Sequence, residues 1–165
     1  MLTPDEVLIV SKENRDENLR FRSYLKNHAD NEELDKQFSE LHKSLFENYD
    51  CSKCRNCCKF LRGEIPSYDI EKDAKHLNMD PQAFIDAYLE QKSNLIYQAK
   101  NLPCDFLKDG NCILDDNKPD GCKKYPYTNE PERLFSLYSV LNVIEICPVA
   151  YEIYEQLKNI YHFKW

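Results

Sequence analysis

The sequence is poor in glycine, and this shortage limits the folds and ligands that it can support. Glycine accounts for only 3 of the 165 residues. Sandwiches and barrels need many tight turns, so the scarcity of glycine disfavours them and favours helices. The three glycines, Gly63, Gly110 and Gly121, also stand far apart. The chain therefore has no glycine-rich loop of the kind that binds phosphate groups.

The chain also lacks a positive net charge and any long apolar run. Its formal net charge is −7 and its isoelectric point is about 5.2. Nucleic-acid affinity comes largely from neutralising phosphates, so an acidic chain is a poor candidate for that partner. No stretch approaches the roughly 20 apolar residues of a membrane span, and residues 1–17 lack the cationic start and long apolar segment of a signal peptide. We therefore expect a cytoplasmic protein with no nucleic-acid or membrane partner.

What the sequence has in quantity is cysteine. Its eight cysteines are Cys51, Cys54, Cys57, Cys58, Cys104, Cys112, Cys122 and Cys147. The first four fall within eight consecutive positions, in the pattern C-x2-C-x2-C-C. Cytoplasmic thiols are kept reduced, and a folded chain of this length does not need disulfides to be stable. The eight thiols therefore indicate metal ligands or redox groups, not a disulfide framework.

The spacing of the cysteines indicates a zinc site or an iron–sulfur cluster. A C-x2-C pair can place two thiolates on one metal ion, and two such pairs make a tetrahedral four-sulfur site. Thiolates select zinc, copper(I) or iron–sulfur clusters. The run C-x2-C-x2-C is also the spacing by which bacterial ferredoxins hold a cluster, with a further ligand in a Cys-Pro pair. Cys51, Cys54 and Cys57 supply such a run, and Cys147-Pro148 offers a distant fourth ligand.

The eight thiols can divide in more than one way. The side chains of the adjacent Cys57 and Cys58 are expected to point in different directions and not to share one ion. Cys58 would then join Cys104, Cys112 and Cys122 in a second site. The sequence leaves open two four-sulfur sites or one cluster with several structural cysteines. Nearby cations can balance the negative charge of such a site: they are Lys53, Arg55, Lys59, Arg62, Lys123 and Lys124.

Helical patterns dominate the rest of the sequence. Apolar residues between positions 34 and 45 recur at spacings of four, three and four, which is one face of a helix. Residues 14–49 are therefore predicted to be helical, with a start at Asp30 or Asn31 inside that range. Asp80-Pro81 predicts the start of a helix over residues 81–91, and Ser67 is predicted to cap a helix before it.

The fold class that these patterns predict is mainly α with a small β-hairpin. Asp109-Gly110 is a tight-turn signal that predicts the hairpin. Residues 133–146 are compatible with a strand or a helix, and Cys147 is predicted to start the last helix. We expect a single irregular domain organised around a cysteine-ligated metal centre. Within it, residues 1–50 are predicted to be an N-terminal helical extension and residues 51–165 a cysteine-cluster metal-binding domain.

The order of the cysteine motifs resembles that of a known family. "CSKCRNCC", "CDFLKDGNCIL", "KPDGCKKYPY" and a final "CP" follow one another as in the CxxCxxCC or YkgJ-type cysteine-cluster proteins. The resemblance runs from Cys51 to about Cys147 and includes all eight cysteines. It implies a zinc- or iron-chelating domain. Lys118 stands where the family usually has arginine and Val149 where it often has glycine, but neither change removes a ligand.

Three functions compete on this basis. The first is a metal-binding protein whose zinc or iron–sulfur centre has a structural or redox role. The second is a protein-modifying enzyme, because one branch of the family resembles flagellin lysine N-methylases. The chain, however, has no recognisable adenosylmethionine loop and lacks the C-x3-C-x2-C spacing of radical enzymes. The third is a metal-free thiol redox switch.

No catalytic residue can be assigned from the sequence. Its four histidines are scattered over predicted helices, where packing or surface roles are expected for them, and no nucleophile, base and orienting acid fall into a recognisable triad. The expected partners are a metal ion or cluster and, at the N-terminal helices, another protein.

Overall fold

The computed structural model describes all 165 residues, and contacts between residues divide them into two units. The helical unit combines Met1–Asp50 with Pro126–Trp165, and the cysteine-rich unit is Cys51–Tyr125. Residues 126–165 group with the N-terminal helices, and the predicted division into an N-terminal extension and a metal-binding domain at residue 50 stays a prediction. The chain is mainly helical with small antiparallel sheets, as predicted. None of its helices combines the length and the apolarity that crossing a membrane requires.

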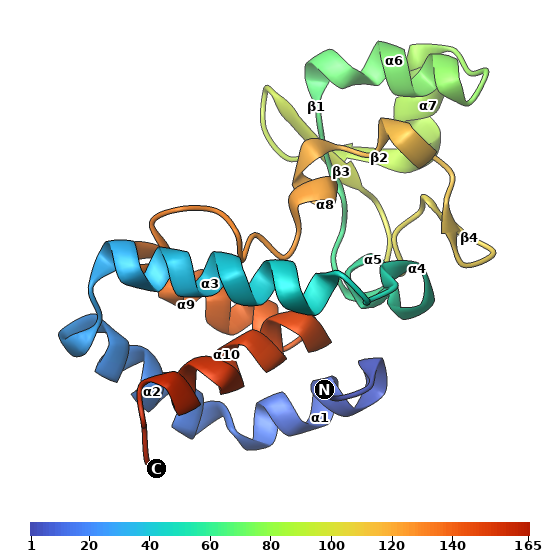
Figure 1. Cartoon of the computed structure of the whole chain (residues 1–165). Coiled ribbons are helices and arrows are strands. Elements are labelled where there is room, and N and C mark those ends of the chain that lie inside the picture. The colour runs from blue at the N-terminus through green and yellow to red at the C-terminus, as the bar shows by residue number, and fades with distance from the viewer. The chain divides into compact units, whose positions relative to one another are not determined.

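Five helices build the helical unit (Figure 1). They are α1 (Pro4–Glu13), α2 (Arg15–His28), α3 (Asn31–Phe46), α9 (Arg133–Ile144) and α10 (Pro148–Ile160). Helix α10 packs against α1, α3 and α9, and α2 packs against α1 and α9. Large side chains such as Phe21, Phe38 and Tyr154 are fully buried among these helices. Burial of this apolar surface is the main force that holds the helices together.

Side-chain caps fix where two of these helices begin. Thr3 Oγ1 accepts a hydrogen bond from the Glu6 N–H and the Glu6 carboxylate accepts one from the Thr3 N–H, which makes a capping box at the start of α1. Asp30 accepts a hydrogen bond of 3.0 Å from the Glu33 N–H, so the predicted start of α3 is confirmed.

Residues 133–146, which the sequence left open between strand and helix, contain helix α9. The two carboxylate oxygens of Asp35, on α3, accept hydrogen bonds of 2.7 Å from the N–H groups of Glu132 and Arg133. A carboxylate at a helix N-terminus satisfies unpaired N–H groups and compensates the positive end of the helix dipole. Because this cap comes from a residue far away in the chain, no local pattern reveals it.

Shorter elements build the cysteine-rich unit. Its α-helices are α4 (Cys51–Cys54), α5 (Asn56–Phe60), α6 (Ile70–His76), α7 (Pro81–Tyr88) and α8 (Asp120–Lys124), with 3-10 turns η1 (Ser67–Asp69) and η2 (Asp115–Asn117). Its strands are β1 (Glu64–Pro66), β2 (Leu89–Gln91), β3 (Ile96–Ala99), β4 (Leu107–Lys108) and β5 (Asn111–Cys112). Strands β1, β3 and β2 form an antiparallel sheet in that order, and β4 pairs with β5.

Local predictions in this unit are partly wrong. The helix predicted for residues 81–91 begins as expected, where the Asp80 side chain accepts backbone hydrogen bonds, but it ends at Tyr88. The next three residues form β2 because they can pair with β3. The predicted cap at Ser67 is also wrong, since Ser67 is the first residue of η1 and α6 begins three residues later.

The hairpin predicted at Asp109-Gly110 is confirmed. Strands β4 and β5 are antiparallel, with Leu107 opposite Cys112. The φ angles are +49° at Asp109 and +77° at Gly110. A two-residue type I′ turn requires positive φ at both positions, and Asp-Gly is among the pairs that tolerate it best.

Candidate metal centre

The first four cysteines lie on two very short helices. Helix α4 carries Cys51 and Cys54, and α5 carries Cys57 and Cys58. Between the helices, Arg55 has the left-handed backbone conformation, with φ 56° and ψ 14°. This one residue ends α4 and lets α5 start in a new direction. Cys54 is buried, whereas Cys51 is exposed.

Cys57 and Cys58 lie closer together than the sequence predicts. Their sulfur atoms are 3.9 Å apart, so the two side chains do not diverge, and the expectation that they bind different ions stays a prediction. The hydrogen bond with Cys57 and the burial of the thiol raise the pKa of Cys58, while the positive charges of Arg55 and Lys118 oppose that rise. The two sulfurs are therefore close enough for the charge of one to disfavour the charge of the other.

Cys104 lies in the apolar core of the cysteine-rich unit. It is 9% exposed and belongs to the same buried cluster as Phe106. Its backbone N–H donates a hydrogen bond of 2.7 Å to the Cys58 carbonyl, which ties the segment after β3 to α5. Burial raises the pKa of the Cys104 thiol, and the backbone N–H groups of Gly63 and Phe106 oppose that rise. Such donors favour the thiolate, which is the form that binds metals.

Gly63 marks the place where Cys104 and Cys122 come together. A Cβ atom at Gly63 would lie 3.4 Å from the Cys122 sulfur and 3.8 Å from the Cys104 sulfur. Because glycine has no such atom, no side chain of residue 63 contacts either sulfur. No local pattern predicts this position of Gly63, since residue 63 is far along the chain from either cysteine.

Neighbouring thiols affect the charge of two cysteines of this unit, Cys104 and Cys122. Cys122 is exposed as a residue, but burial of its sulfur, followed by the neighbouring thiols of Cys104, Cys58 and Cys112, raises its pKa. Cys58 and Cys112 likewise raise the pKa of Cys104. Cys58 lies on α5 and Cys104 in the loop before β4. Cys112 lies on β5 and Cys122 on α8. In the positions that the structure gives them, no three His, Cys, Asp or Glu side chains are close enough to hold a metal ion.

The chemistry of this thiol group fits a soft metal ion. Thiolate sulfur is the ligand that zinc, copper(I) and iron–sulfur clusters prefer. Neighbouring thiols that raise one another's pKa would be stabilised as thiolates by a bound cation. Gly63 places no side chain against two of the sulfurs. Closing four sulfurs around one ion at about 2.3 Å requires them to move together, so binding would be coupled to ordering of the unit.

The basic residues near the thiols differ in what they interact with. Arg62 forms an ion pair with Glu90 on β2 and is thereby engaged with the sheet. The pKa values of Cys58 and Cys122 are both raised, and the positive charge of Lys118 opposes that rise in each case. The sequence had marked Lys118 only as a departure from the family pattern, because its distance from Cys58 along the chain hides their proximity.

Cys147 belongs to the helical unit. It is 8% exposed and caps α10, with Pro148 at the first helical position, so the predicted start of the last helix is confirmed. Its sulfur accepts a hydrogen bond of 3.5 Å from the Ala150 N–H. Its assignment as a metal ligand stays a prediction, as do those of Cys51, Cys54 and the other thiols.

Two of the four histidines make contacts that fit packing roles. His42 Nδ1 lies 2.8 Å from Thr128 Oγ1 in the helical unit, and burial lowers the pKa of the imidazole. His76 Nε2 lies 3.2 Å from the Ile113 carbonyl oxygen in the cysteine-rich unit. These two ring nitrogens thus have hydrogen-bond partners within the protein, which agrees with the packing or surface roles expected for the histidines.

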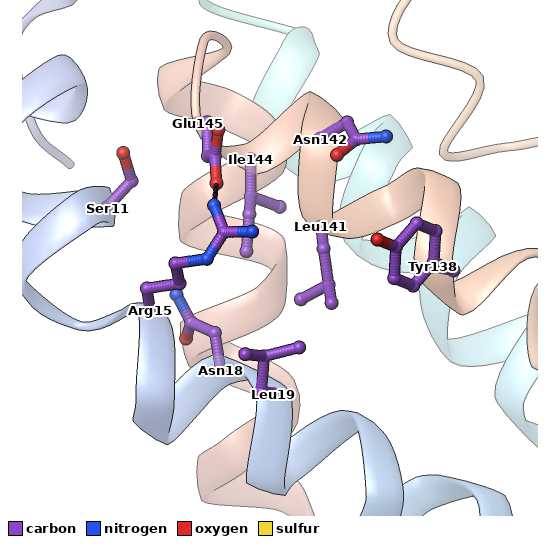
Figure 2. A pocket seen from close by; sticks show the side chains of 9 residues that line it. All are labelled: Ser11, Arg15, Asn18, Leu19, Tyr138, Leu141, Asn142, Ile144 and Glu145. Atoms are coloured by element: carbon purple, nitrogen blue, oxygen red, sulfur yellow. Dashed lines mark hydrogen bonds and ion pairs between the residues drawn. The ribbon is translucent and has the colours of Figure 1, made fainter.

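The helical unit contains a small cavity between the α1–α2 junction and α9 (Figure 2). Its volume of about 20 Å³ has room for about one water molecule. The buried side chains of Ser11 and Asn18 line it, and the ion pair of Arg15 Nη1 with Glu145 Oε1, at 2.8 Å, lies beside it. A space of this size does not fit an organic substrate, so the thiol group remains the better candidate for the functional site.

Comparison with known proteins agrees with the chemistry of the thiols. A family model named CxxCxxCC, described as "Putative zinc- or iron-chelating domain", matches residues 50–148. No curated protein and no solved structure matches the chain. The family match covers more than half of the chain and includes all eight cysteines. The chain therefore belongs to the CxxCxxCC family, whose domain is associated with the chelation of zinc or iron.

Proposed function

We propose that the chain binds a zinc ion or an iron–sulfur cluster through its cysteine thiolates, and that the centre has a structural or redox role. The observation that carries this proposal is that the Cys104 and Cys122 sulfurs both lie against Gly63, with Cys58 and Cys112 near enough to raise the pKa of each. Family membership supports metal chelation in general. A reducing compartment such as the cytoplasm would keep these thiols available.

The proposal divides seven of the thiols into two sets. Cys58, Cys104, Cys112 and Cys122 form a four-sulfur site within the cysteine-rich unit. Cys51, Cys54 and Cys57, on helices α4 and α5 of the same unit, are assigned to a second centre. The assignment of Cys147 as a metal ligand stays a prediction. The short distance between the Cys57 and Cys58 sulfurs would place the two centres next to each other.

A metal-free redox switch is the second candidate, because the Cys57 and Cys58 sulfurs are only 3.9 Å apart. Geometry disfavours it. Disulfide-bonded cysteines usually have Cα atoms about 4.4–6.8 Å apart, whereas adjacent residues are held about 3.8 Å apart by a trans peptide. A bond between these neighbours would be strained and easily reduced, so the metal proposal is preferred.

The first test is the metal content of the protein purified without oxygen. An absorption spectrum and elemental analysis of zinc, iron and acid-labile sulfide identify the centre. A colourless protein with one or two zinc ions per chain indicates four-sulfur zinc sites. Visible absorbance with matched iron and sulfide indicates a cluster. A protein with neither metal nor sulfide, but with reversible disulfides, would reject the proposal in favour of the redox switch.

Cysteine-to-serine variants test the division into two sets. Cys122→Ser removes a ligand from the first set and Cys54→Ser from the second. If there are two sites, each variant should lose part of the metal and keep the rest, and its melting temperature should fall with the lost metal. If there is a single cluster, only the variant that removes a true ligand should lose metal, and it should lose all of it. Unchanged metal content in both variants would refute their assignment as ligands.

A further inference from the structure

Arg55 has a backbone conformation that its residue type disfavours. Its φ of 56° and ψ of 14° lie in the left-handed region. Non-glycine residues are uncommon there because the Cβ atom crowds the following carbonyl group, whereas glycine adopts this conformation freely. An arginine at this position therefore carries backbone strain that a glycine would not have. Strained residues of this kind often persist where the side chain has a function.

The Arg55 side chain reaches the hairpin that carries Cys112. Its Nε atom donates a hydrogen bond of 2.9 Å to the Gly110 carbonyl, and its Nη2 atom donates one of 3.3 Å to Asn111 Oδ1. Gly110 lies in the turn between β4 and β5. One guanidinium group thus joins the segment between Cys54 and Cys57 to the tip of the hairpin.

A second hydrogen bond joins the same two segments of the chain, before the first strand of the hairpin. The Cys104 N–H donates a hydrogen bond of 2.7 Å to the Cys58 carbonyl. The α4–α5 segment and the 104–112 segment are therefore held together at two points, one at the turn and one beside the thiols. Of the two, only the link at the turn depends on a side chain and can be removed by substitution.

We propose that Arg55 is a positioning residue that holds the 104–112 hairpin against the α4–α5 segment, so that Cys112 is kept on the side of the segment that carries Cys58 until a metal ion draws the two sulfurs together. This inference rests on the proposed metal-binding function. Arg55 touches no metal in this proposal. It acts through the hairpin, by reducing the movement that the sulfurs must make when they close around the ion.

The shape of the guanidinium group is the reason that arginine suits this role. Its planar fork directs two N–H groups to two acceptors at fixed angles, whereas a lysine ammonium is a point charge on a flexible chain. Arg55→Lys keeps the positive charge near the thiols but loses the fork. Arg55→Gly removes the side chain and also relieves the left-handed backbone. The two variants together separate the effects of charge, hydrogen bonding and strain.

The experiment measures zinc affinity of the full chain, reduced and without oxygen, by competition with a chromogenic chelator. We expect the zinc dissociation constant to rise about tenfold in both Arg55→Lys and Arg55→Gly, the loss typical for residues that orient metal ligands. The control Lys59→Gln removes a positive charge from the same segment and should change the constant by less than about twofold. Metal-free Arg55→Gly should melt no lower than the wild type, while amide exchange in β4 and β5 becomes faster.

The zinc affinities of the wild type and the two variants separate the positioning role from the proposed function. If the wild type binds zinc and Arg55→Gly binds it equally tightly, the positioning role is wrong while the proposed function stands. If Arg55→Lys keeps wild-type affinity and Arg55→Gly does not, charge and not the hydrogen-bonding fork is responsible, and the inference is again wrong. If the wild type binds neither zinc nor iron, the proposed function fails and this inference fails with it.

Discussion

At the residue scale, the atoms around each thiol differ even though the residue type is the same. Burial raises the pKa of Cys104, and the backbone N–H groups of Gly63 and Phe106 oppose that rise. Cys58 has a second sulfur at 3.9 Å and the charges of Arg55 and Lys118 nearby. Hydrogen bonds and positive charges both stabilise a thiolate, but burial and neighbouring thiolates oppose it. The ease with which each cysteine gives up its proton to a metal is therefore set by its neighbours, not by the spacing of the motif.

A residue away from the thiols gives a prediction about pH. Burial lowers the pKa of His42 below its ordinary value of 6.5, so protonation of this imidazole favours the unfolded chain. The stability that neutral His42 contributes is complete above about pH 6.5 and declines as the pH falls through that value, by at most about 1.4 kcal/mol per pH unit. Below the folded pKa the decline stops. Urea unfolding between pH 7.5 and pH 5 measures this slope.

The control for this prediction is His42→Gln, which cannot titrate and can still bond to Thr128. The variant keeps all eight thiols, so any effect of pH on the metal centre is the same in both proteins. The free energy of unfolding of the wild type should fall relative to that of the variant as the solution becomes acidic. Parallel curves for the two proteins would show that His42 has the same pKa in the folded and unfolded chains.

At the scale of elements, the β4–β5 hairpin is small, yet it carries Cys112, a predicted ligand of the candidate centre. Its strands have two residues each, and isolated hairpins of this size are not stable in water. Its support comes from packing of Phe106 in the core and from the hydrogen bonds of Arg55 to the turn. The position of Cys112 thus depends on the turn geometry and on contacts outside the hairpin.

The turn gives a prediction with its own control. Gly110 has a φ of +77° and open space around a Cβ atom, so Gly110→Val should destabilise the chain through backbone strain alone, by roughly 1–2 kcal/mol. The neighbouring Asp109 also has positive φ, and Asp109→Gly should leave stability unchanged or raise it. Urea unfolding of both metal-free variants measures the two effects. Equal destabilisation by the two substitutions would indicate that this turn is not left-handed in solution.

At the scale of the whole molecule, the two units rest on different sources of stability. The helical unit buries large side chains such as Phe21, Phe38 and Tyr154 in a core of long helices. The cysteine-rich unit has short helices and strands, and its buried cluster includes a thiol among its members. Small units with modest cores commonly need a metal or other crosslink. A metal centre would therefore matter more for this unit than for the other.

Removal of the metal tests this difference between the units. A strong chelator should accelerate amide hydrogen exchange in residues 51–125, because metal binding and ordering are coupled there. Exchange in α2, α3 and α9 should change little. Mass spectrometry of peptic fragments before and after chelation measures both units in one sample, and addition of the metal should reverse the change.

The same experiment also bears on Cys147. If this cysteine is a ligand, chelation should accelerate exchange in the first turn of α10 as well, and Cys147→Ser should reproduce that change without chelator. If exchange in α10 is insensitive to chelation, Cys147 is not a ligand. Faster exchange across the whole chain would contradict the separate stabilisation of the two units.

The sequence predicted those features that depend on neighbouring residues. The start of α3 at Asp30, the start of α7 at Asp80 and the turn at Asp109-Gly110 all follow from local hydrogen bonds or φ angles. Strand β2 was missed because it exists only by pairing with β3. Helix α9 stayed undecided because Asp35, its cap, lies on α3. The errors are thus found where a distant segment decides the local conformation.

The sequence by itself determined the class of chemistry, since eight thiols in the order of the CxxCxxCC family indicate a soft metal whatever their positions in space. Tertiary structure alone decided which thiols act on one another, that Gly63 stands beside two sulfurs, and that Arg55 reaches the hairpin. The physical reason is one of range. Ligand preference is a property of each side chain, whereas the separation of two sulfurs depends on how backbone segments far apart in the chain are folded and hydrogen-bonded to one another.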